Sequence, residues 1–476
     1  MISMMAMNAG EASAQGKASK THTETFPVVA AQKGDKAFTL EDLNFGGNNY
    51  RNMVAKNRWC TWWGDELVRQ DIDACYLVNK ATGKETKLFS IDQVNQWIAP
   101  TKDIKVRALY NAQFPFAGKS IVMVSNGSKL FTIDFKKHKL ISEMEYAEGE
   151  SLLEANAQQN AFAYLKGSNL YVRTFDVANY NAMTKDKKSH DFQISTDGSR
   201  EIVYGQSVHR DEFGISKGTF WSPNGEKLAF YRMDQSMVTD YPQVDIPEIG
   251  FDHPETQSCI ATPAPDKYPM AGETSHKVTV GVFDCLTGKT IYLKAGDPTD
   301  RYFTNIAWSP DGKTIYMFEL NRDQNDCRLT AYSAETGEKT GELYRETDEK
   351  YVEPCHPIQF LPWDSSSFIM QSRKDGYNHL YLCEVKNEER RTKNSNAESS
   401  SKMQENSSLF TLHSSLSIRQ LTSGKWEVMD VLGFNAKTKS IIIASNECSP
   451  IQRNIFSVNT KTGKRKMIDD CGKGWH

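Results

Sequence analysis

The chain has 476 residues, of which 39% are hydrophobic and 25% are charged, and its formal net charge is −3 at pH 7. Acidic and basic residues are interspersed, so the charge pattern gives no electrostatic basis for binding nucleic acid. No stretch approaches the ~18 consecutive apolar residues of a membrane-spanning helix. We therefore expect a large globular protein with neither a nucleic-acid partner nor a membrane span.

Residues 1–35 are predicted to be a disordered leader. Its beginning is mildly apolar and ends in Ala12-Ser13-Ala14, a small-residue pattern typical of a signal-peptide cleavage site. The apolar part is short and no Lys or Arg precedes it, which indicates the remnant of a signal peptide whose start was set too far downstream. The alternative is an ordinary leader with chance alanines. A genuine signal would place the protein in the periplasm or outside the cell.

Residues 61–476 carry a repeated strand-and-turn pattern that predicts a β-propeller. The segment WSPNGEKLAFYRM begins at Trp221, and its counterpart WSPDGKTIYMFEL begins at Trp308. In each, Pro fixes φ and Gly accepts positive φ, so that a tight turn leads into an alternating apolar strand. Looser copies run from Phe360 to Val385 and from Phe434 to Ile468.

Further hairpins complete the repeat. They occupy residues Leu77 to Phe89, Phe131 to Ile141, Leu170 to Asp176 and Val278 to Leu293. Roughly seven units, each of about four strands and ~40–50 residues, predict an all-β propeller, because radial repetition leaves few sheet edges exposed. A β-sandwich is the alternative, but a single core rarely grows beyond ~250–300 residues. Helical periodicity is confined to short pieces such as Ser90 to Ile98.

Two compositional features predict a polar insertion and argue against a metal site. Residues 387–408 are rich in Ser and Asn and lack aromatic residues, so we expect a polar insertion over 387–417 between the outer strands of one blade. The nine cysteines are scattered, without a CxxC pair or a His at ligand spacing, which argues against a zinc site. We expect most of them to be small buried residues, with their disulfide state open, and we predict no metal and no cofactor.

Gly214 to Gly218 match the G-x-S-x-G pattern of a hydrolase nucleophile elbow, with Ser216 at the centre. In such enzymes a strand leads into the serine and a helix follows it. Here the charged run VHRDEF precedes the serine, and a strand with a Pro-Asn-Gly turn follows, so no helix N-terminus is available for an oxyanion site. A self-sufficient hydrolase that uses Ser216 is therefore the disfavoured alternative.

Asp211 and Glu212 form an acidic pair between His209-Arg210 and Phe213-Gly214, in a polar loop that precedes a predicted blade strand. Two adjacent carboxylates beside apolar residues can bind a cation, because an ionised acceptor forms hydrogen bonds roughly twice as strong as a neutral one does. The alternative is a solvated charge cluster, and residue spacing alone favours that alternative.

A family resemblance favours the cation-binding interpretation of this acidic pair over a solvated charge cluster. The sequence resembles the propeller region of the dipeptidyl peptidase IV family of serine exopeptidases, and within that family it is most similar to the prolyl tripeptidyl peptidases of Bacteroidetes. The likeness covers residues 36–476 and is densest from about residue 200 onward. It is carried by Val203 to Val238, Tyr268 to Asp284, Thr304 to Gly312, Tyr351 to Pro362, Gln371 to Leu382 and Leu421 to Val428.

The resemblance implies a fold, an activity and site residues. Family members join an eight-bladed propeller to an α/β-hydrolase domain, and they remove two or three residues from the free N-terminus of peptides, usually after proline. Glu212 matches the propeller acid that binds the substrate's α-amine. Asp211 falls where dipeptidyl peptidases carry a second acid and tripeptidyl relatives usually do not, so the length of the released peptide stays open. Tyr351 is a weaker candidate for a rim contact.

The sequence also departs from the family. It stops at His476, where relatives continue through a last blade into the domain that carries the Ser, Asp and His. We therefore expect an incomplete propeller of about seven blades, no catalytic residue in this chain and no activity alone. Within residues 36–60, Thr39 to Leu43 resembles a segment that packs on the hydrolase domain.

The expected partners are peptides with a free N-terminus, the C-terminal hydrolase domain and a second copy of the chain. A non-catalytic binding or scaffold propeller is the alternative function. The sequence leaves open which residue is preferred before the cleaved bond. It also leaves open whether this shortened chain still forms the dimer that is common in the family.

Overall fold

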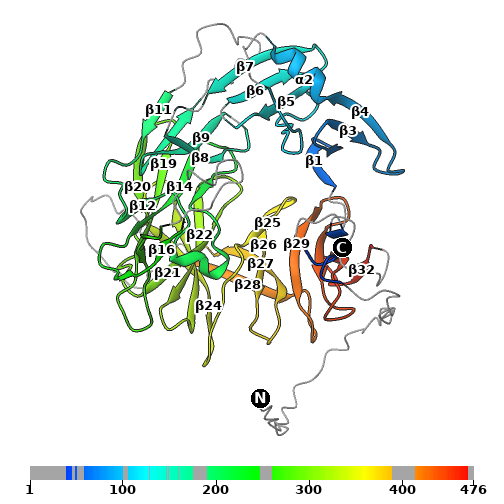
Figure 1. Cartoon of the computed structure of the whole chain (residues 1–476). Coiled ribbons are helices and arrows are strands. Elements are labelled where there is room, and N and C mark those ends of the chain that lie inside the picture. Colours follow the sequence, from blue (N-terminus) through cyan, green and yellow to red (C-terminus); the bar gives the residue numbers. More distant parts are fainter. Residues whose placement is uncertain are drawn as a thin grey trace, which may run out of the picture.

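A computed structural model of the chain describes residues 39–44, 49–50, 58–99, 105–127, 129–145, 147, 149–158, 160–174, 190–246, 260–388 and 413–469. The expected leader, residues 1–35, and most of the expected polar insertion, residues 387–417, lie outside them. Seven of the sheets formed by the described strands follow one another around a ring, so that the first and the last of the seven lie on the same side of it (Figure 1). The prediction of an all-β propeller with about seven blades is confirmed.

The first three blades come from the N-terminal part of the chain. Blade one contains β1 (Trp59–Trp63), β2 (Glu66–Gln70), β3 (Ala74–Val78) and β4 (Glu85–Ser90). Blade two contains β5 (Ile121–Ser125), β6 (Lys129–Asp134) and β7 (Lys139–Glu145). Blade three contains β8 (Glu150–Ala155), β9 (Ala161–Lys166), β10 (Asn169–Thr174) and β11 (His190–Gln193). Consecutive strands in each blade pair antiparallel, as short turns between them require.

The other four blades complete the ring. Blade four contains β12 (Ile202–Tyr204), β13 (Thr219–Trp221), β14 (Lys227–Asp234), β19 (Lys277–Asp284) and β20 (Lys289–Tyr292). Blade five contains β21 (Arg301–Trp308), β22 (Thr314–Asn321), β23 (Asp326–Ser333) and β24 (Lys339–Thr347). Blade six contains β25 (Gln359–Leu361), β26 (Asp364–Ser372), β27 (His379–Glu388) and β28 (His413–Gln420). Blade seven contains β29 (Val428–Asn435), β30 (Ser440–Ser445), β31 (Asn454–Asn459) and β32 (Arg465–Met467).

The predicted short helix is α2 (Ile91–Ile98), between blades one and two. Ser90 caps its N-terminus, because the Ser90 hydroxyl accepts a 3.3 Å hydrogen bond from the Gln93 amide and the Gln93 side chain accepts one of 2.9 Å in return. This capping box satisfies two backbone donors that the first helical turn leaves unpaired. The helical interpretation of Ser90 to Ile98 is confirmed.

The apolar core lies between neighbouring blades. One cluster joins β14 and β19 of blade four to β21 and β22 of blade five, and the next joins β22 and β23 to β26 and β27. Cys75, Cys327 and Cys383 are buried within such clusters with free thiols, whereas Cys60 is exposed. The expectation that cysteines serve as small core residues is therefore confirmed for these three.

Tryptophans at the ends of two inner strands tie blades four and five each to the preceding blade. The Trp221 indole N–H donates a 3.3 Å hydrogen bond to the Glu154 carbonyl of blade three. The Trp308 indole N–H donates one of 2.9 Å to the Phe220 carbonyl of blade four. The repeated WSP motif therefore supplies a turn and an inter-blade contact together.

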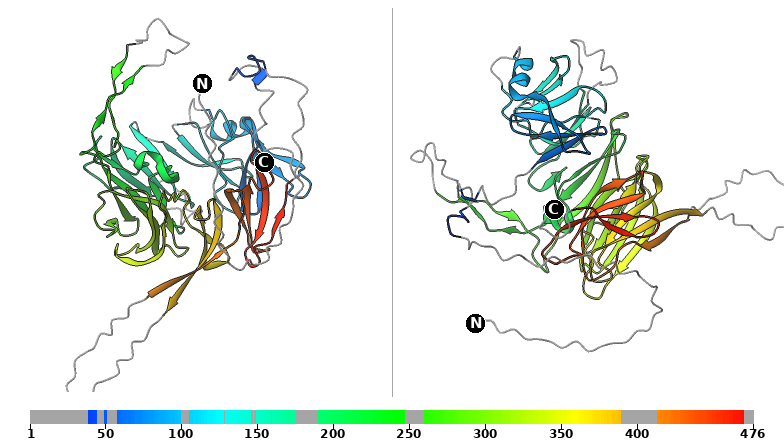
Figure 2. Two further views of the ribbon diagram at one scale, coloured as in Figure 1. Left: turned by 90° about the horizontal axis from the view of Figure 1, so that it is seen from below. Right: turned by 90° about the vertical axis from the view of Figure 1, so that its right-hand side faces the viewer.

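Blade four also carries an arm. β15 (Asp240–Tyr241) pairs with β18 (Asp266–Lys267), and β16 (Val244–Asp245) pairs with β17 (Thr262–Pro263), so that two short ladders extend the hairpin between β14 and β19. Figure 2 shows these green strands projecting away from the body of the blade. Among the described residues no helix has both the length and the apolarity needed to cross a lipid bilayer.

Candidate functional site

The acidic pair lies in a loop that interrupts the inner strand of blade four. β12 pairs with one end of β14 and β13 pairs with the other, and residues 205–218 leave the sheet between them. The base of the loop closes on one residue, because the Gly205 amide donates to the Tyr231 carbonyl at 2.9 Å and the Tyr231 amide donates to the Gly218 carbonyl at 2.9 Å. Glycine is required at Gly218, where a Cβ would collide with the Gln206 carbonyl.

Within the loop, the turn η2 (His209–Gly214) has an uncommon backbone. His209, Arg210 and Asp211 adopt φ of 53°, 60° and 63°, Glu212 returns to φ −63°, and Phe213 has φ 57°. A left-handed backbone costs roughly 1–2 kcal/mol for each residue with a Cβ. Such a turn persists only where its surroundings hold it in place, and conformations of this kind concentrate at functional sites. In Figure 1 the green helical turn lies on the inner side of the ring.

Buried anchors on both sides of the acidic pair supply that restraint. His209 and Phe213 are both buried, and both contact the Tyr302 ring, with centroid separations of 4.9 Å and 5.0 Å. The Asn305 amide donates a 3.0 Å hydrogen bond to the Phe213 carbonyl and also donates to the Pro354 carbonyl. Gly214 has φ 72° and lies so close to the Cys355 carbonyl that a Cβ would collide with it.

Between these anchors, Asp211 and Glu212 are exposed. Within the part of the chain that the structure describes, neither carboxylate forms an ion pair. The neighbouring cation does not neutralise them, since the Arg210 guanidinium pairs with Asp266 of the arm and lies 4.9 Å from the Tyr268 ring centroid. The turn therefore presents two adjacent anionic acceptors that are free to bind a cation from solution.

The segment that precedes blade six borders the same turn. Its residue Pro354 shares the Asn305 amide with Phe213. The close approach of Gly214 to the Cys355 carbonyl places this segment beside the turn, and burial together with the charges of Glu353 and Glu212 raises the pKa of the Cys355 thiol. Tyr351, the candidate rim residue, is 55% exposed in that segment. The segment that contains Tyr351 therefore contacts the acidic turn at Cys355 and is linked to it at Pro354 through the Asn305 amide.

Burial lowers the pKa of two histidines close to the acidic pair, His209 in the turn itself and His276. The His209 and His276 rings lie 6.3 Å apart, and both ring nitrogens of His209 lack a hydrogen-bond partner within the described residues. Burial lowers the pKa of His209 to about 3, and the neighbouring His276 contributes to the shift. Burial also lowers the pKa of His276, with the Arg210 charge adding to the effect. Neither imidazole therefore neutralises the acidic pair at neutral pH.

Ser216 does not lie in a nucleophile elbow. It is exposed, and the chain continues through Lys217, whose ammonium is 2.6 Å from a Glu154 carboxylate oxygen, into strand β13. A strand stands where an elbow needs a helix, as the sequence indicates. Among the described residues no cluster of three or more His, Cys, Asp or Glu side chains could hold a metal ion.

Sequence reasoning singled out the carboxylates but missed the residues that position them. Tyr302 and Asn305 come from β21, and Tyr231 comes from β14. Asn305 has φ 54° at an irregular point of β21, between Thr304 and Ala307. An Asn between Thr304 and the apolar residues Ile306 and Ala307 of the strand was the available signal, because a buried amide needs hydrogen-bond partners.

Comparison with known proteins identifies the family of the chain. The family profile for the dipeptidyl peptidase IV (DPP IV) N-terminal region matches residues 117–476. The chain belongs to the dipeptidyl peptidase IV family. Its match to this family confirms the resemblance that the sequence motifs indicated.

Solved and curated relatives support the family assignment. The chain is 41% identical to a Bacteroides ovatus protein whose crystal structure was solved as that of a candidate dipeptidyl aminopeptidase IV, with a TM-score of 0.72 over 90% of this chain and 55% of that one. The Porphyromonas gingivalis dipeptidyl peptidase 4 shares the fold, with 20% identity and a TM-score of 0.63 over 92% of this chain and 56% of that one. A Pyrenophora tritici-repentis protein named a probable dipeptidyl-aminopeptidase B is 23% identical over 94% of this chain and 48% of its own length. The chain spans about half the length of these relatives.

Proposed function

We propose that the chain is the propeller region of a prolyl-specific dipeptidyl or tripeptidyl serine peptidase, in which it gates substrate entry and recognises the peptide N-terminus. Glu212 accepts the α-ammonium group, and Asp211 is the second acceptor. One observation carries the proposal: two exposed carboxylates without an ion-pair partner among the described residues stand on a turn held by buried anchors. A pre-organised acceptor loses little conformational entropy when it binds an ammonium group.

In this proposal the chain supplies recognition, and a C-terminal hydrolase domain supplies the Ser, Asp and His that cleave the peptide bond. Tyr351 lines the rim of the recognition site. We expect the chain alone to leave a prolyl p-nitroanilide peptide intact. Turnover that a serine-directed fluorophosphonate abolishes would favour Ser216 as a nucleophile instead.

Calorimetry with a proline-containing tripeptide and its N-acetylated twin tests the recognition step. A charged hydrogen bond contributes about 1.5–3 kcal/mol, so loss of the ammonium should weaken binding at least about tenfold. Glu212→Gln should weaken binding of the free-amine peptide by a similar factor and leave the acetylated peptide unaffected. Glu335→Gln, at an exposed turn of blade five, is the matched control.

Equal binding of the two peptides would refute the proposal and favour a scaffold propeller that binds a partner without needing a free amine. Unchanged binding in Glu212→Gln would assign the ammonium to another acceptor. Asp211→Asn tests the contribution of the second carboxylate on its own. If the enzyme releases tripeptides, we expect this variant to lose less affinity for the free-amine peptide than Glu212→Gln does.

We also propose that the chain forms a homodimer through its arm. Four apolar side chains of the arm are exposed to solvent. A group of exposed apolar side chains is typical of a surface that contacts another protein. The four are Tyr241 at 42%, Val244 at 64%, Ile246 at 61% and Ile260 at 75%. Light scattering should give a dimer mass for the chain and a monomer mass for Val244→Glu, and a monomer mass for the unmodified chain would contradict the dimer.

The proposed site of action is the periplasm or the outside of the cell. The Ala12-Ser13-Ala14 pattern supports export, although it lies outside the described residues. Fractionation of the native host should find the protein outside the cytoplasm, beginning near Gln15.

A further inference from the structure

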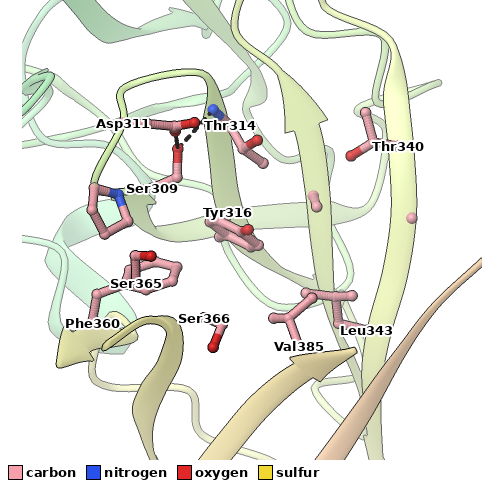
Figure 3. Close-up of a pocket in the computed structure, with 13 residues that line it drawn as sticks. Ser309, Asp311, Thr314, Tyr316, Thr340, Leu343, Phe360, Ser365, Ser366 and Val385 are labelled. Atoms are coloured by element: carbon pink, nitrogen blue, oxygen red, sulfur yellow. Dashed lines mark hydrogen bonds between the residues drawn. The ribbon is translucent and has the colours of Figure 1, made fainter. Parts of the chain in front are cut away.

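A polar cavity opens between blades five and six, away from the acidic turn. Its volume is about 390 Å³, and no residue of the loop 205–218 lines it. The turn after β21 forms one wall, strands β22 to β24 form the floor, and β25, the start of β26 and β27 form the other wall (Figure 3). Its lining includes Asp311, Tyr316, Thr340, Gly341, Phe360 and Ser365.

Asp311 supplies a fixed anionic acceptor at the rim. One of its carboxylate oxygens accepts hydrogen bonds from the Ser309 hydroxyl at 2.6 Å and from the Lys313 amide at 3.1 Å. Its other oxygen has no hydrogen-bond partner within the described residues. The Ser309 hydrogen bond lowers the pKa of Asp311, so that the side chain is ionised at neutral pH.

Tyr316 supplies an aromatic face and a free hydroxyl. Figure 3 shows it rising from β22 between the Asp311 turn and the Phe360 ring, and its ring centroid is 5.5 Å from that of Phe360. Its side chain is largely buried, yet its hydroxyl makes no hydrogen bond within the described residues. The hydroxyls of Thr340 and Ser365 also lack partners there. Three unpaired hydroxyls and one carboxylate oxygen therefore line a single cavity.

The charges of the lining exclude several ligand classes. Among the described residues, no Lys, Arg or His lines the cavity, and Asp311 is the only ionised residue of that lining. A phosphate or carboxylate ligand would find no countercharge and would meet the Asp311 anion. Hydroxyls that both donate and accept, together with one carboxylate and two aromatic rings, instead match a neutral molecule with many hydroxyl groups. We propose that this cavity binds a neutral saccharide.

The corresponding turn in blade four carries neither the carboxylate nor the tyrosine. There Ser222 donates a 2.7 Å hydrogen bond to Asn224, which stands at the position of Asp311. Ala229 stands at the position of Tyr316. The turn of blade four thus forms without a carboxylate and without a tyrosine at these positions.

The cavity has room for more than one sugar ring. A Cβ built on Gly341 meets no atom within 4 Å. A second cavity of about 770 Å³ shares Pro310, Phe360 and Ser365 with the first and continues toward Trp308 and Trp363. Longer saccharides can therefore extend along a wall rich in aromatic residues, where sugar rings pack their apolar faces.

Saturation-transfer NMR and calorimetry on the whole chain test the proposal with maltose, cellobiose, lactose and N,N′-diacetylchitobiose. We expect at least one to bind at millimolar concentration, and we expect glucuronate to bind more weakly than glucose. Asp311→Asn should weaken binding of the best disaccharide about tenfold, because it loses a hydrogen bond to a charged acceptor. Tyr316→Phe should weaken it about threefold, as expected for one neutral hydrogen bond.

Asn224→Asp, the mirrored change in blade four, is the matched control and should leave binding unchanged. Asp311→Asn reproduces a side chain that the same turn accommodates one blade earlier, and equal melting temperatures would verify its folding. The proposal is overturned if none of the four disaccharides binds, if both cavity variants bind like the unmodified chain, or if the control loses as much affinity as they do.

Discussion

Asn305 and Phe213 are joined by a 3.0 Å hydrogen bond from the Asn305 side-chain amide to the Phe213 carbonyl. The same amide also donates to the Pro354 carbonyl, so one side chain of blade five holds the acidic turn of blade four and the segment that leads into blade six. Asn305 is itself left-handed, with φ 54°, at the irregular point of β21. Three consecutive blades thus meet at one buried amide beside Glu212.

Removal of that amide should loosen the turn. Asn305→Gly keeps a residue that accepts positive φ but leaves two buried carbonyls without a donor, which costs about 1–3 kcal/mol of the free energy of unfolding. Asn305→Ala should cost about 1 kcal/mol more, because a Cβ disfavours that φ. Urea titration measures both values. The role assigned to the amide would be wrong if Asn305→Gly were as stable as the unmodified chain and bound the free-amine tripeptide equally well.

Gly214 offers a second test of how rigidly the turn is held. Its φ is 72°, and a Cβ there would collide with the Cys355 carbonyl. Gly214→Ala should therefore lose about 1–2 kcal/mol for the backbone conformation and a further amount for the collision, and peptide binding should fall with it.

Gly272→Ala is the control for this prediction, because Gly272 has φ 81° but a Cβ would meet nothing within 4 Å. The difference between the two variants isolates the contact with Cys355. Equal losses of stability in both variants would mean that the turn shifts freely away from the segment before blade six.

The sequence predicts the repeated architecture well and the setting of the site poorly. Turn motifs such as those at Trp221 and Trp308 depend on residues close in sequence, so hairpins and blades follow from local chemistry. The split inner strand does not, because Gly205 and Gly218, 13 residues apart, both pair with Tyr231 of another strand. Likewise, Asn305 reaches Phe213 across 92 residues of sequence, a contact that no local pattern encodes. The carboxylates of Asp211 and Glu212 stood out through family resemblance rather than through spacing.

His209 should make the stability of this chain sensitive to acid. Burial lowers its pKa to about 3 in the folded state, against 6.5 for an unperturbed histidine. Between these two pH values the unfolded chain binds a proton that the folded chain does not, so the free energy of unfolding decreases as pH falls from about 6.5. The decrease contributed by this one group is at most about 1.4 kcal/mol for each pH unit.

His209→Asn removes the titrating group and keeps a residue type that tolerates positive φ. Urea titrations between pH 7 and pH 4 should show a shallower loss of stability for this variant than for the unmodified chain. His138→Asn is the matched control, because His138 is exposed and has φ 55°. Parallel pH profiles for the unmodified chain and His209→Asn would show that His209 is hydrated in the folded state.

Trp308 tests whether the repeated tryptophans hold the ring together. Its indole N–H donates a 2.9 Å hydrogen bond to the Phe220 carbonyl, and its side chain is 9% exposed between blades four and five. Trp308→Phe should remove that hydrogen bond and part of the buried area, at a cost of about 1–3 kcal/mol. Trp221→Phe should cost less, because its bond to Glu154 is 3.3 Å long and its side chain is less buried. The two melting temperatures measure this order. If Trp221→Phe proves the more damaging change, the tie between blades three and four is the stronger one, and the inter-blade energy does not follow hydrogen-bond length and burial.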